Sequence, residues 1–299
     1  MEQYYRDFGN WLREQFPFKV QKISINAGFT CPNRDGRVGR GGCIYCNNQT
    51  FNPTYCDKQK NVTEQLEDGK RFFARKYPDM KYLAYFQAYT NTYGTNSHLK
   101  ALYEEALAVE DVVGLVIGTR PDCINDDLLD YFEELNQRTF LIVEYGVETC
   151  NDATLRLINR GHDFDCAKQA IERTASRGIR VGAHIILGLP GEDENESLRQ
   201  APIISSLPLT TLKIHQMQII RGTKLAKMYE EHPFHLYSVD EYIHLIAEYI
   251  SRLRTDLILE RFVSQSPPEL LIAPKWGLKN YEFTHRLNNY MKEHCIKKC

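Results

Sequence analysis

The sequence has no strong excess of charge of either sign. It contains 37 lysines and arginines and 39 aspartates and glutamates among 299 residues, which gives a formal net charge of −2. A balance near neutrality does not require a nucleic acid or an anionic membrane as partner. A nucleic-acid partner would therefore need a local basic patch.

The sequence also lacks long apolar runs. The longest ones, such as Val112–Ile117 and His184–Pro190, are far shorter than the roughly 20 residues that cross a bilayer. The first ten residues hold neither a basic region nor an apolar stretch. Because low-complexity segments are missing as well, we expect a folded, cytoplasmic protein that does not associate with membranes.

Cysteine is present in an odd number, nine, which favours free thiols and metal ligands over disulfides in a reducing compartment. Cys31, Cys43, Cys46 and Cys56 are grouped near the N-terminus, while the others are scattered. A chain of this length does not need a metal in order to fold. A metal held by the grouped cysteines would therefore serve chemistry.

Short β-branched or aromatic runs alternate with amphipathic stretches, which predicts parallel strands joined by crossover helices. The six predicted strands are Val20–Asn26, Tyr82–Gln87, Val113–Thr119, Leu141–Glu148, Arg180–Leu187 and Leu212–Ile219. The predicted helices between them are Val62–Tyr77, Ser97–Val109, Asn125–Leu135, Phe164–Arg177 and Glu194–Ser205. This order fits an open doubly wound sheet or a complete or partial barrel, and both place ligands at the carboxyl ends of the strands.

Three regions follow from this pattern. Residues 1–19 hold a predicted helix, Glu2–Glu14, and residues 20–221 form the βα core. Residues 222–299 form a C-terminal extension, with a helix at Val239–Arg254 and a possible strand at Leu257–Phe262. The last part, Lys275–Cys299, is the only basic patch, with six lysines and arginines against two glutamates.

The first predicted strand leads into a glycine-rich loop with the spacing C-x11-C-x2-C, from Cys31 through Cys43 to Cys46. An iron–sulfur cube held by three cysteines keeps one iron open to another ligand, whereas structural zinc takes four ligands. Cys56 could supply the fourth ligand of a zinc site. The spacing alone leaves both sites open.

Further motifs accompany the cysteines: Ile117–Asp122, Tyr145–Thr149, Arg160–His162 and Gly188–Glu192. With them, Val20 to Ile220 resembles the radical S-adenosylmethionine (SAM) superfamily, in the branch of elongator catalytic-subunit-like and oxygen-independent coproporphyrinogen-oxidase-like proteins. Pro267–Gly277 resembles the closing segment of the YhcC/YtqA (MnmL)-like bacterial family. The resemblance implies a partial (β/α)6 TIM-type barrel with an N-terminal helix and a C-terminal extension.

The resemblance also implies two cofactors. Cys31, Cys43 and Cys46 would hold a 4Fe-4S cluster, whose open iron would chelate SAM. One electron, from a donor such as flavodoxin or ferredoxin, would then cleave SAM to a deoxyadenosyl radical. No catalytic residue is assigned beyond these cofactors.

Candidate SAM contacts follow partly from the residues and partly from the resemblance. Strand alternation places Glu148 where its carboxylate could reach a ribose hydroxyl or the ammonium, although it could instead form a structural ion pair with Arg120 or Arg160. Arg160 matches a family position near the SAM carboxylate. The further candidates are Tyr45 near the adenine, His184, and the segment of Gln87, Ala88, Tyr89 and Thr90.

The substrate is implied by the resemblance alone. The YhcC/YtqA-like family is associated with tRNA wobble uridine, where a radical step would shorten a carboxymethylaminomethyl side chain to aminomethyl before a separate methyltransferase acts. The basic tail carries Trp276, Tyr281, Phe283 and Tyr290, which suit phosphate contact and base stacking, but it could also be an amphipathic helix covering the barrel base. The alternatives are a radical SAM enzyme acting on a small molecule or peptide, and a zinc-stabilised, non-catalytic nucleic-acid-binding module.

Overall fold

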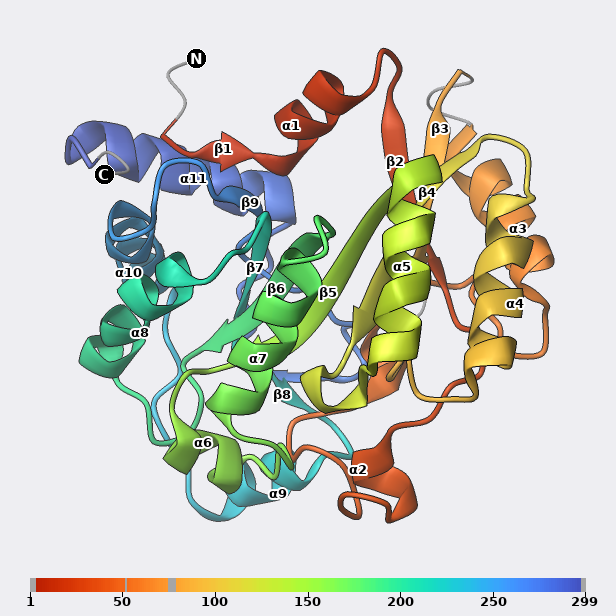
Figure 1. The fold of residues 1–299 in the computed structure, drawn as a ribbon. Helices are drawn as coiled ribbons and strands as arrows, with labels where there is room; N and C mark the ends of the chain where they lie inside the picture. The colour runs from red at the N-terminus through yellow and green to blue at the C-terminus, as the bar shows by residue number, and fades with distance from the viewer. Residues whose placement is uncertain (1–3, 52, 75–78, 297–299) are drawn as a thin grey trace.

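The computed structural model describes residues 4–51, 53–74 and 79–296 (Figure 1). Eight parallel strands form one curved sheet in the order β1-β9-β7-β6-β5-β4-β3-β2. The six central strands are β2 (Val20–Ile25), β3 (Lys81–Phe86), β4 (Val112–Thr119), β5 (Phe140–Glu148), β6 (Arg180–Leu187) and β7 (Thr211–Gln216). They correspond to the six predicted strands, and the curved parallel sheet confirms the predicted partial barrel.

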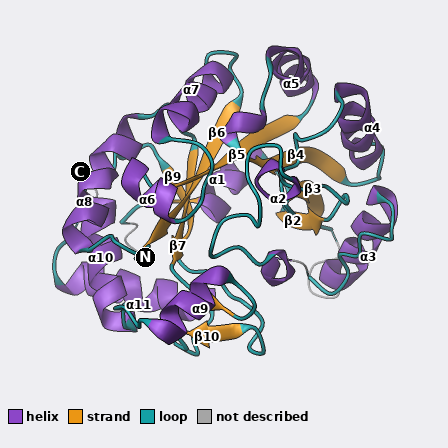
Figure 2. Ribbon diagram, turned by 90° about the horizontal axis from the view of Figure 1, so that it is seen from below, coloured by secondary structure: helices purple, strands orange, loops and turns teal. Residues whose placement is uncertain are grey.

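Helices cover the outer face of the sheet (Figure 2). They are α3 (Val62–Ala74), α4 (Asn96–Leu107), α5 (Asp126–Arg138), α7 (Phe164–Ala175) and α8 (Glu194–Ser206), with α10 (Val239–Ser251) beside α8. Local signals set where they begin: Asn125 caps α5, Asp163 caps α7 and Asp193 caps α8, each by a side chain that accepts from a backbone N–H. The predicted helix Val62–Tyr77 is described as far as Ala74, and residues 75–78 lie outside the described part.

Side chains alternate between the two faces of each strand, so the sheet has one apolar core on its outer face and one on its inner face. Outward residues such as Leu115 and Val143 pack against the helices. Inward residues such as Val116 and Ile142 meet Trp11 of helix α1 (Phe8–Gln15), which closes the end of the barrel where the strands begin.

Strand β9 (Ile258–Arg261), which falls within the possible strand predicted at Leu257–Phe262, and strand β1 (Arg6–Asp7), which was not predicted, extend the sheet beyond the six strands of the βα core. Strand β9 pairs with β7 on one side and with β1 on the other. The predicted helix Glu2–Glu14 is wrong at its start, because Arg6 and Asp7 pair with β9 and the Asp7 carboxylate caps a helix that begins at Phe8. Residues 1–3 lie outside the description.

The remaining elements lie beyond the carboxyl ends of the strands or over β9. Helix α2 (Pro32–Asp35), the turn η1 (Asn48–Phe51), the turn η2 (Pro121–Cys123), α6 (Asp152–Leu157) and α9 (Lys224–Glu231) belong to the loops that follow strands. The predicted strand Leu212–Ile219 is divided between β7 and β8 (Ile219–Ile220), and β8 pairs antiparallel with β10 (Leu271–Ala273). Helix α11 (Asn280–Glu293) packs on α10.

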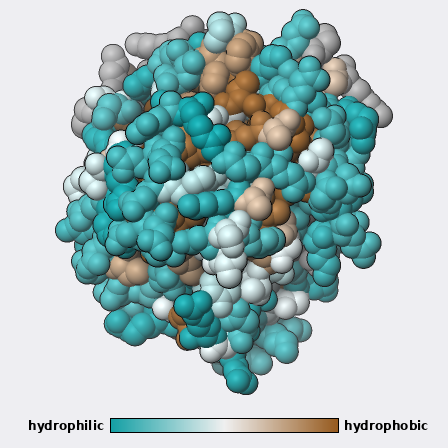
Figure 3. Space-filling model, turned by 45° about the vertical axis from the view of Figure 1, so that its right-hand side comes forward, coloured by the Kyte–Doolittle hydropathy of each residue, from teal (hydrophilic) through white to brown (hydrophobic). Residues whose placement is uncertain are grey.

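The surface seen in Figure 3 is mostly hydrophilic, with hydrophobic residues gathered in a recess in its upper half. Across the described ranges, no helix combines the length and the hydrophobicity needed to span a bilayer.

Candidate active site

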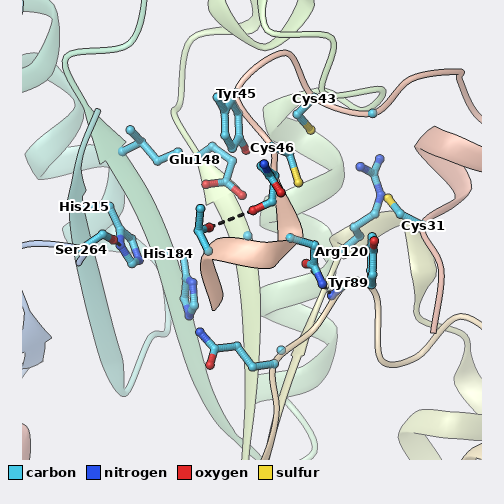
Figure 4. Close-up of a pocket in the computed structure, with 18 of the residues that line it drawn as sticks. Cys31, Cys43, Tyr45, Cys46, Tyr89, Arg120, Glu148, His184, His215 and Ser264 are labelled. Carbon is cyan, nitrogen blue, oxygen red and sulfur yellow. Dashed lines mark hydrogen bonds between the residues drawn. The ribbon is translucent and has the colours of Figure 1, made fainter. Parts of the chain in front are cut away.

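One large cavity opens at the carboxyl ends of the strands, with an empty volume of about 1240 Å³ that includes its open mouth. Its lining comes from the cysteine-bearing loop, from β3 to β7, and from the segment after β9. Figure 4 shows the cysteines on one side of this cavity and His215 and Ser264 on the other. The side chains that the sequence singled out therefore converge at the end of the barrel where ligands of such folds bind.

The cysteine-bearing loop is shaped by local hydrogen bonds. The Cys31 carbonyl accepts from the backbone N–H of Arg34 at 2.8 Å, and the Cys43 carbonyl accepts from that of Cys46 at 3.0 Å. The Arg34 guanidinium donates to the Cys46 carbonyl at 2.7 Å. Gly42 has a φ of +78°, and a Cβ there would come within 2.8 Å of Arg34, so this turn requires glycine.

All three cysteines of the motif line the cavity. The Cys43 sulfur accepts from Asn33 Nδ2 and from Arg160 Nη1, each at 3.7 Å, so it lies among groups that stabilise negative charge. Within the described ranges, no three histidine, cysteine, aspartate or glutamate side chains converge closely enough to hold a single metal ion. Three cysteines on one side of a cavity suit a cluster, in which each sulfur binds a different iron.

Cys56 does not join the other three cysteines. Its thiol donates to the Ser24 carbonyl at 2.9 Å, and it is not part of the cavity lining. Burial raises the pKa of Cys56 to about 12, so it stays a thiol at neutral pH. The zinc site that needed Cys56 as its fourth ligand is not formed.

Glu148 and Arg160 form a buried pair at the cavity wall, with 3.4 Å between Glu148 Oε1 and Arg160 Nη2. Arg160 also donates to the Gly146 carbonyl, and its Nε is buried without a partner. Glu148 has a φ of +70°, a rare conformation for a residue with a side chain. Strained residues held this way cluster at functional sites.

Arg120, at the end of β4, adds a second guanidinium to this wall. It donates two hydrogen bonds of 2.8 Å to Asp122 and one of 2.9 Å to the Arg160 carbonyl. Its Nη1 is buried and has no partner. With Arg160 Nε, the cysteine side of the cavity thus holds two buried N–H groups without acceptors, which fits the carboxylate group of a cofactor.

The other predicted contacts occupy different positions. Tyr45, Gln87, Tyr89, Thr90 and His184 line the cavity, whereas Ala88 is buried and does not. Tyr45 packs against the apolar cluster under the cysteine-bearing loop. Gln87 accepts from the Ser24 hydroxyl at 2.9 Å, and Tyr89, with a φ of +62°, keeps 38% of its surface exposed.

His184 belongs to a charged network that sequence reasoning missed. Glu144 is 1% exposed and accepts from Lys213 at 2.6 Å, from Lys22 at 2.9 Å and from His184 Nε2 at 2.9 Å. Burial alone would raise the pKa of Glu144, but Lys213, Lys22 and His184 lower it well below its usual value. Burial, with the charge of Lys213, lowers the pKa of His184, so its imidazole is neutral.

Glu260 completes the network by accepting from Lys22 at 2.7 Å and lying 3.3 Å from Lys213. The sequence holds a signal for this network, because Lys22, Glu144 and Lys213 each fall within a predicted strand. Buried charges of this kind need partners.

The model of the Radical SAM superfamily matches residues 30–199, and that of the Radical_SAM C-terminal domain matches residues 209–293. The chain belongs to the radical SAM superfamily. Members of this superfamily use a 4Fe-4S cluster and SAM, which confirms the two predicted cofactors.

Relatives support the predicted branch of this radical SAM protein. It is 38% identical to protein YtqA of Bacillus subtilis over 97% of this chain and 90% of that one. It is 27% identical to a tRNA uridine(34) acetyltransferase of Methanocaldococcus jannaschii, over 62% of this chain and 34% of that one. The archaeal Methanocaldococcus infernus Elp3 structure shares the fold, with a TM-score of 0.71 and 17% identity over 93% of this chain and 64% of that one.

The aromatic side chains of the basic tail, Lys275–Cys299, are not all at the surface, as the prediction of base stacking requires. Phe283 is fully buried, and Trp276 stacks on it while donating to the Tyr237 carbonyl at 3.1 Å. The prediction that Phe283 stacks on a base is therefore wrong, because Phe283 lies in the core, while Trp276 is partly buried against it. Within the described part of the tail, Asn280–Glu293 forms the amphipathic helix α11. Tyr281 is 67% exposed, and residues 297–299 lie outside the description.

Proposed function

We propose that this radical SAM enzyme modifies the wobble uridine of tRNA, shortening a carboxymethylaminomethyl side chain to aminomethyl. The observation that carries the tRNA assignment is the similarity to a tRNA uridine(34) acetyltransferase over 62% of this chain. The shared fold with the archaeal Elp3 structure agrees with it. A separate methyltransferase would act on the product.

Different residues of the cavity would bind the two cofactors. Cys31, Cys43 and Cys46 would hold the cluster, and Arg160, Arg120 and Glu148 would bind the charged end of SAM. When bound, the two cofactors would supply the one-electron chemistry that removes a hydrogen atom from the carbon between the side-chain amine and the carboxylate. Loss of one further electron to the oxidised cluster would give an imine, and its hydrolysis by water would release the aminomethyl side chain and glyoxylate. A flavodoxin or ferredoxin would provide the electron, and a cytoplasmic location would keep the thiols reduced.

The protein itself would bind, orient and shield the reactants. The cysteine-bearing loop is held to the barrel by the Ile44 N–H, which donates to the Ile158 carbonyl at 3.0 Å, and by the Leu225 N–H, which donates to the Ile44 carbonyl at 2.9 Å. These bonds close one side of the cavity. A closed site limits access of water to a reactive species.

The loops that follow the strands carry basic groups suited to a polyanion, outside the residues that line the cavity. Arg37 and Arg40 are exposed on the loop between Cys31 and Cys43, and Arg221 and Lys224 are exposed where helix α9 begins beside that loop. We name these four residues the basic rim. Phosphate contacts of this kind position a nucleic acid without reading its bases.

The test is anaerobic incubation of the reconstituted enzyme with SAM, dithionite and tRNA that carries carboxymethylaminomethyluridine, followed by nucleoside mass spectrometry. We expect aminomethyluridine to form and the carboxymethylaminomethyl nucleoside to disappear. Cys43→Ala should lose iron, and it should form neither aminomethyluridine nor deoxyadenosine, because one cluster ligand is missing. The matched control Cys166→Ala should retain them, since Cys166 lies outside the cavity lining.

The outcomes separate the alternatives. Deoxyadenosine release with unchanged tRNA would reject the proposed substrate and favour a small molecule or peptide. Retained SAM cleavage in Cys43→Ala would contradict the assignment of the cluster ligands.

A further inference from the structure

The end of the cavity opposite the cysteines is formed by strands β7 and β9 and the segment that follows β9 (Figure 4). Here His215 donates to or accepts from the Ser264 hydroxyl, and Arg261 and Ser266 complete the lining. None of the residues assigned to the cluster or to SAM lies on these strands. This end is therefore available to the substrate.

A β-bulge turns Arg261 into the barrel. Leu212 pairs with Leu259, but the next residue, Lys213, pairs with Arg261, so Glu260 is an extra residue in β9. Glu260 already faces the interior, where it contacts Lys22 and Lys213. The bulge places Arg261 on the same side, although simple alternation would send it outward.

Arg261 differs from the other interior cations because it has no acidic partner. Lys22 and Lys213 are each shared between Glu144 and Glu260. Over the described ranges, the Arg261 side chain makes no hydrogen bond or ion pair, and its Nε is buried without an acceptor. An interior cation without a counter-charge is costly unless a ligand supplies one.

We propose that Arg261 is the receptor for a carboxylate group of the substrate. Its planar guanidinium matches a planar carboxylate with two parallel hydrogen bonds, and the Ser264 hydroxyl lines the same cavity. This inference rests on the proposed function, whose substrate carries a carboxylate on the very side chain that reacts. The carboxylate at Arg261 would point that side chain back toward the cysteine side of the cavity.

A backbone phosphate of tRNA is the other source of such an anion. Arg261 lies on a strand inside the barrel, whereas exposed basic residues for phosphates lie on the rim at the mouth. The position of Arg261 therefore favours a group small enough to enter with the base.

The test measures binding of two nucleosides, 5-carboxymethylaminomethyluridine and 5-aminomethyluridine, to the anaerobic holoenzyme with SAM by equilibrium dialysis. Neither nucleoside contains a phosphate. We expect the wild type to prefer the carboxylate nucleoside by roughly tenfold to a hundredfold, the range of a charge-assisted hydrogen bond. Arg261→Met should abolish this preference, and Arg261→Lys should restore part of it, while iron content and SAM affinity stay unchanged.

Arg71→Met is the matched control, because Arg71 is an exposed arginine on α3 that pairs with Asp68. It should bind both nucleosides as the wild type does. A preference that survives in Arg261→Met would overturn the proposal, as would an equal loss of both affinities.

A second measurement separates this inference from the proposed function. The thermal stability of wild type and Arg261→Met is followed with acetate and with inorganic phosphate. If the wild type shows no nucleoside preference but acetate stabilises it and not Arg261→Met, the proposed substrate fails and the carboxylate receptor stands. Stabilisation by phosphate alone, or by neither anion in the absence of a nucleoside preference, overturns the receptor.

Discussion

Gly146 is the residue on which the Glu148–Arg160 pair depends. A Cβ at this position would come within 2.5 Å of Glu148 Oε1 and 2.6 Å of Arg160 Nη2. Real Cβ atoms do not approach other atoms so closely, so both charged ends would have to move. They are the tips of side chains, and the backbone could stay in place.

Gly146→Ala should therefore weaken SAM binding without unfolding the protein. We expect the dissociation constant for SAM to rise about tenfold, the cost of disturbing one charge-assisted contact. Equilibrium dialysis of the anaerobic protein measures it, and iron analysis checks that the cluster is retained.

Gly94→Ala is the control for the glycine change itself. The nearest atom to a Cβ there is Leu99 Cδ2 at 3.4 Å, an ordinary contact. Unchanged SAM affinity in Gly146→Ala would show that Glu148 and Arg160 do not bind this cofactor.

At the scale of elements, Glu144 ties several strands together inside the barrel. Its carboxylate on β5 accepts from Lys22 on β2, from His184 on β6 and from Lys213 on β7. Lys22 in turn reaches Glu260 on β9, so the network joins the two sides of the curved sheet.

Glu144→Gln should destabilise the fold by about 3–5 kcal/mol at neutral pH, because it leaves buried lysines without full compensation. Urea unfolding measures the change. Glu134→Gln, an exposed change on α5, should stay within about 0.5 kcal/mol of the wild type.

The effect should also depend on pH. The pKa of Glu144 is lowered in the folded state, so its carboxylate stabilises the fold above the ordinary glutamate value of 4.5. That stabilisation is lost as the pH falls below this value toward the folded pKa. The difference between wild type and Glu144→Gln should therefore shrink in acid, and a constant or growing difference would contradict the network.

The central strands could be predicted because their alternation is local. Val116 and Ile142 face the inner core while Leu115 and Val143 face the helices, and this pattern is readable in the sequence. The bulge at Glu260 could not be predicted, since it arises from the pairing of β9 with β7, which are distant in sequence. The possible strand Leu257–Phe262 therefore includes Arg261 but does not predict on which face of the sheet its side chain lies.

The candidate site could also be predicted only in part from the sequence. The spacing of Cys31, Cys43 and Cys46 places them on one short loop, so their meeting at one cavity could be anticipated. Ala88 was expected at the SAM site but is buried outside the cavity lining, because which residues of a turn face a cavity depends on packing. The partners of Glu144 come from other strands and needed the three-dimensional structure.

On the scale of the whole molecule, basic groups occupy two separate places. The basic rim of Arg37, Arg40, Arg221 and Lys224 belongs to the loops that follow the strands, at the end of the barrel where the cavity opens. Helix α11 carries Arg286 and Lys292 but lies at the end of the molecule near α1, away from α2 and the cysteine-bearing loop (Figure 1). A tRNA that inserts its wobble base into the cavity must approach the rim.

Reversing charges at the rim should therefore weaken tRNA binding more than reversing charges on α11. We expect Arg37→Glu with Lys224→Glu to lower the affinity strongly, and the slope of log K against log salt to become shallower by about one for each phosphate that the variant no longer neutralises. Fluorescence anisotropy of labelled tRNA at several salt concentrations measures both quantities.

The matched control is Arg286→Glu with Lys292→Glu, which makes the same change in net charge. If electrostatics acts only through the overall charge, the two double variants will weaken binding equally, and the rim has no special role. A larger loss of affinity in the α11 variant would assign the tRNA to the opposite end of the barrel. Since the reacting base must reach the cavity beside the cysteines, a loss confined to the rim variant would connect tRNA binding to the site of the chemistry.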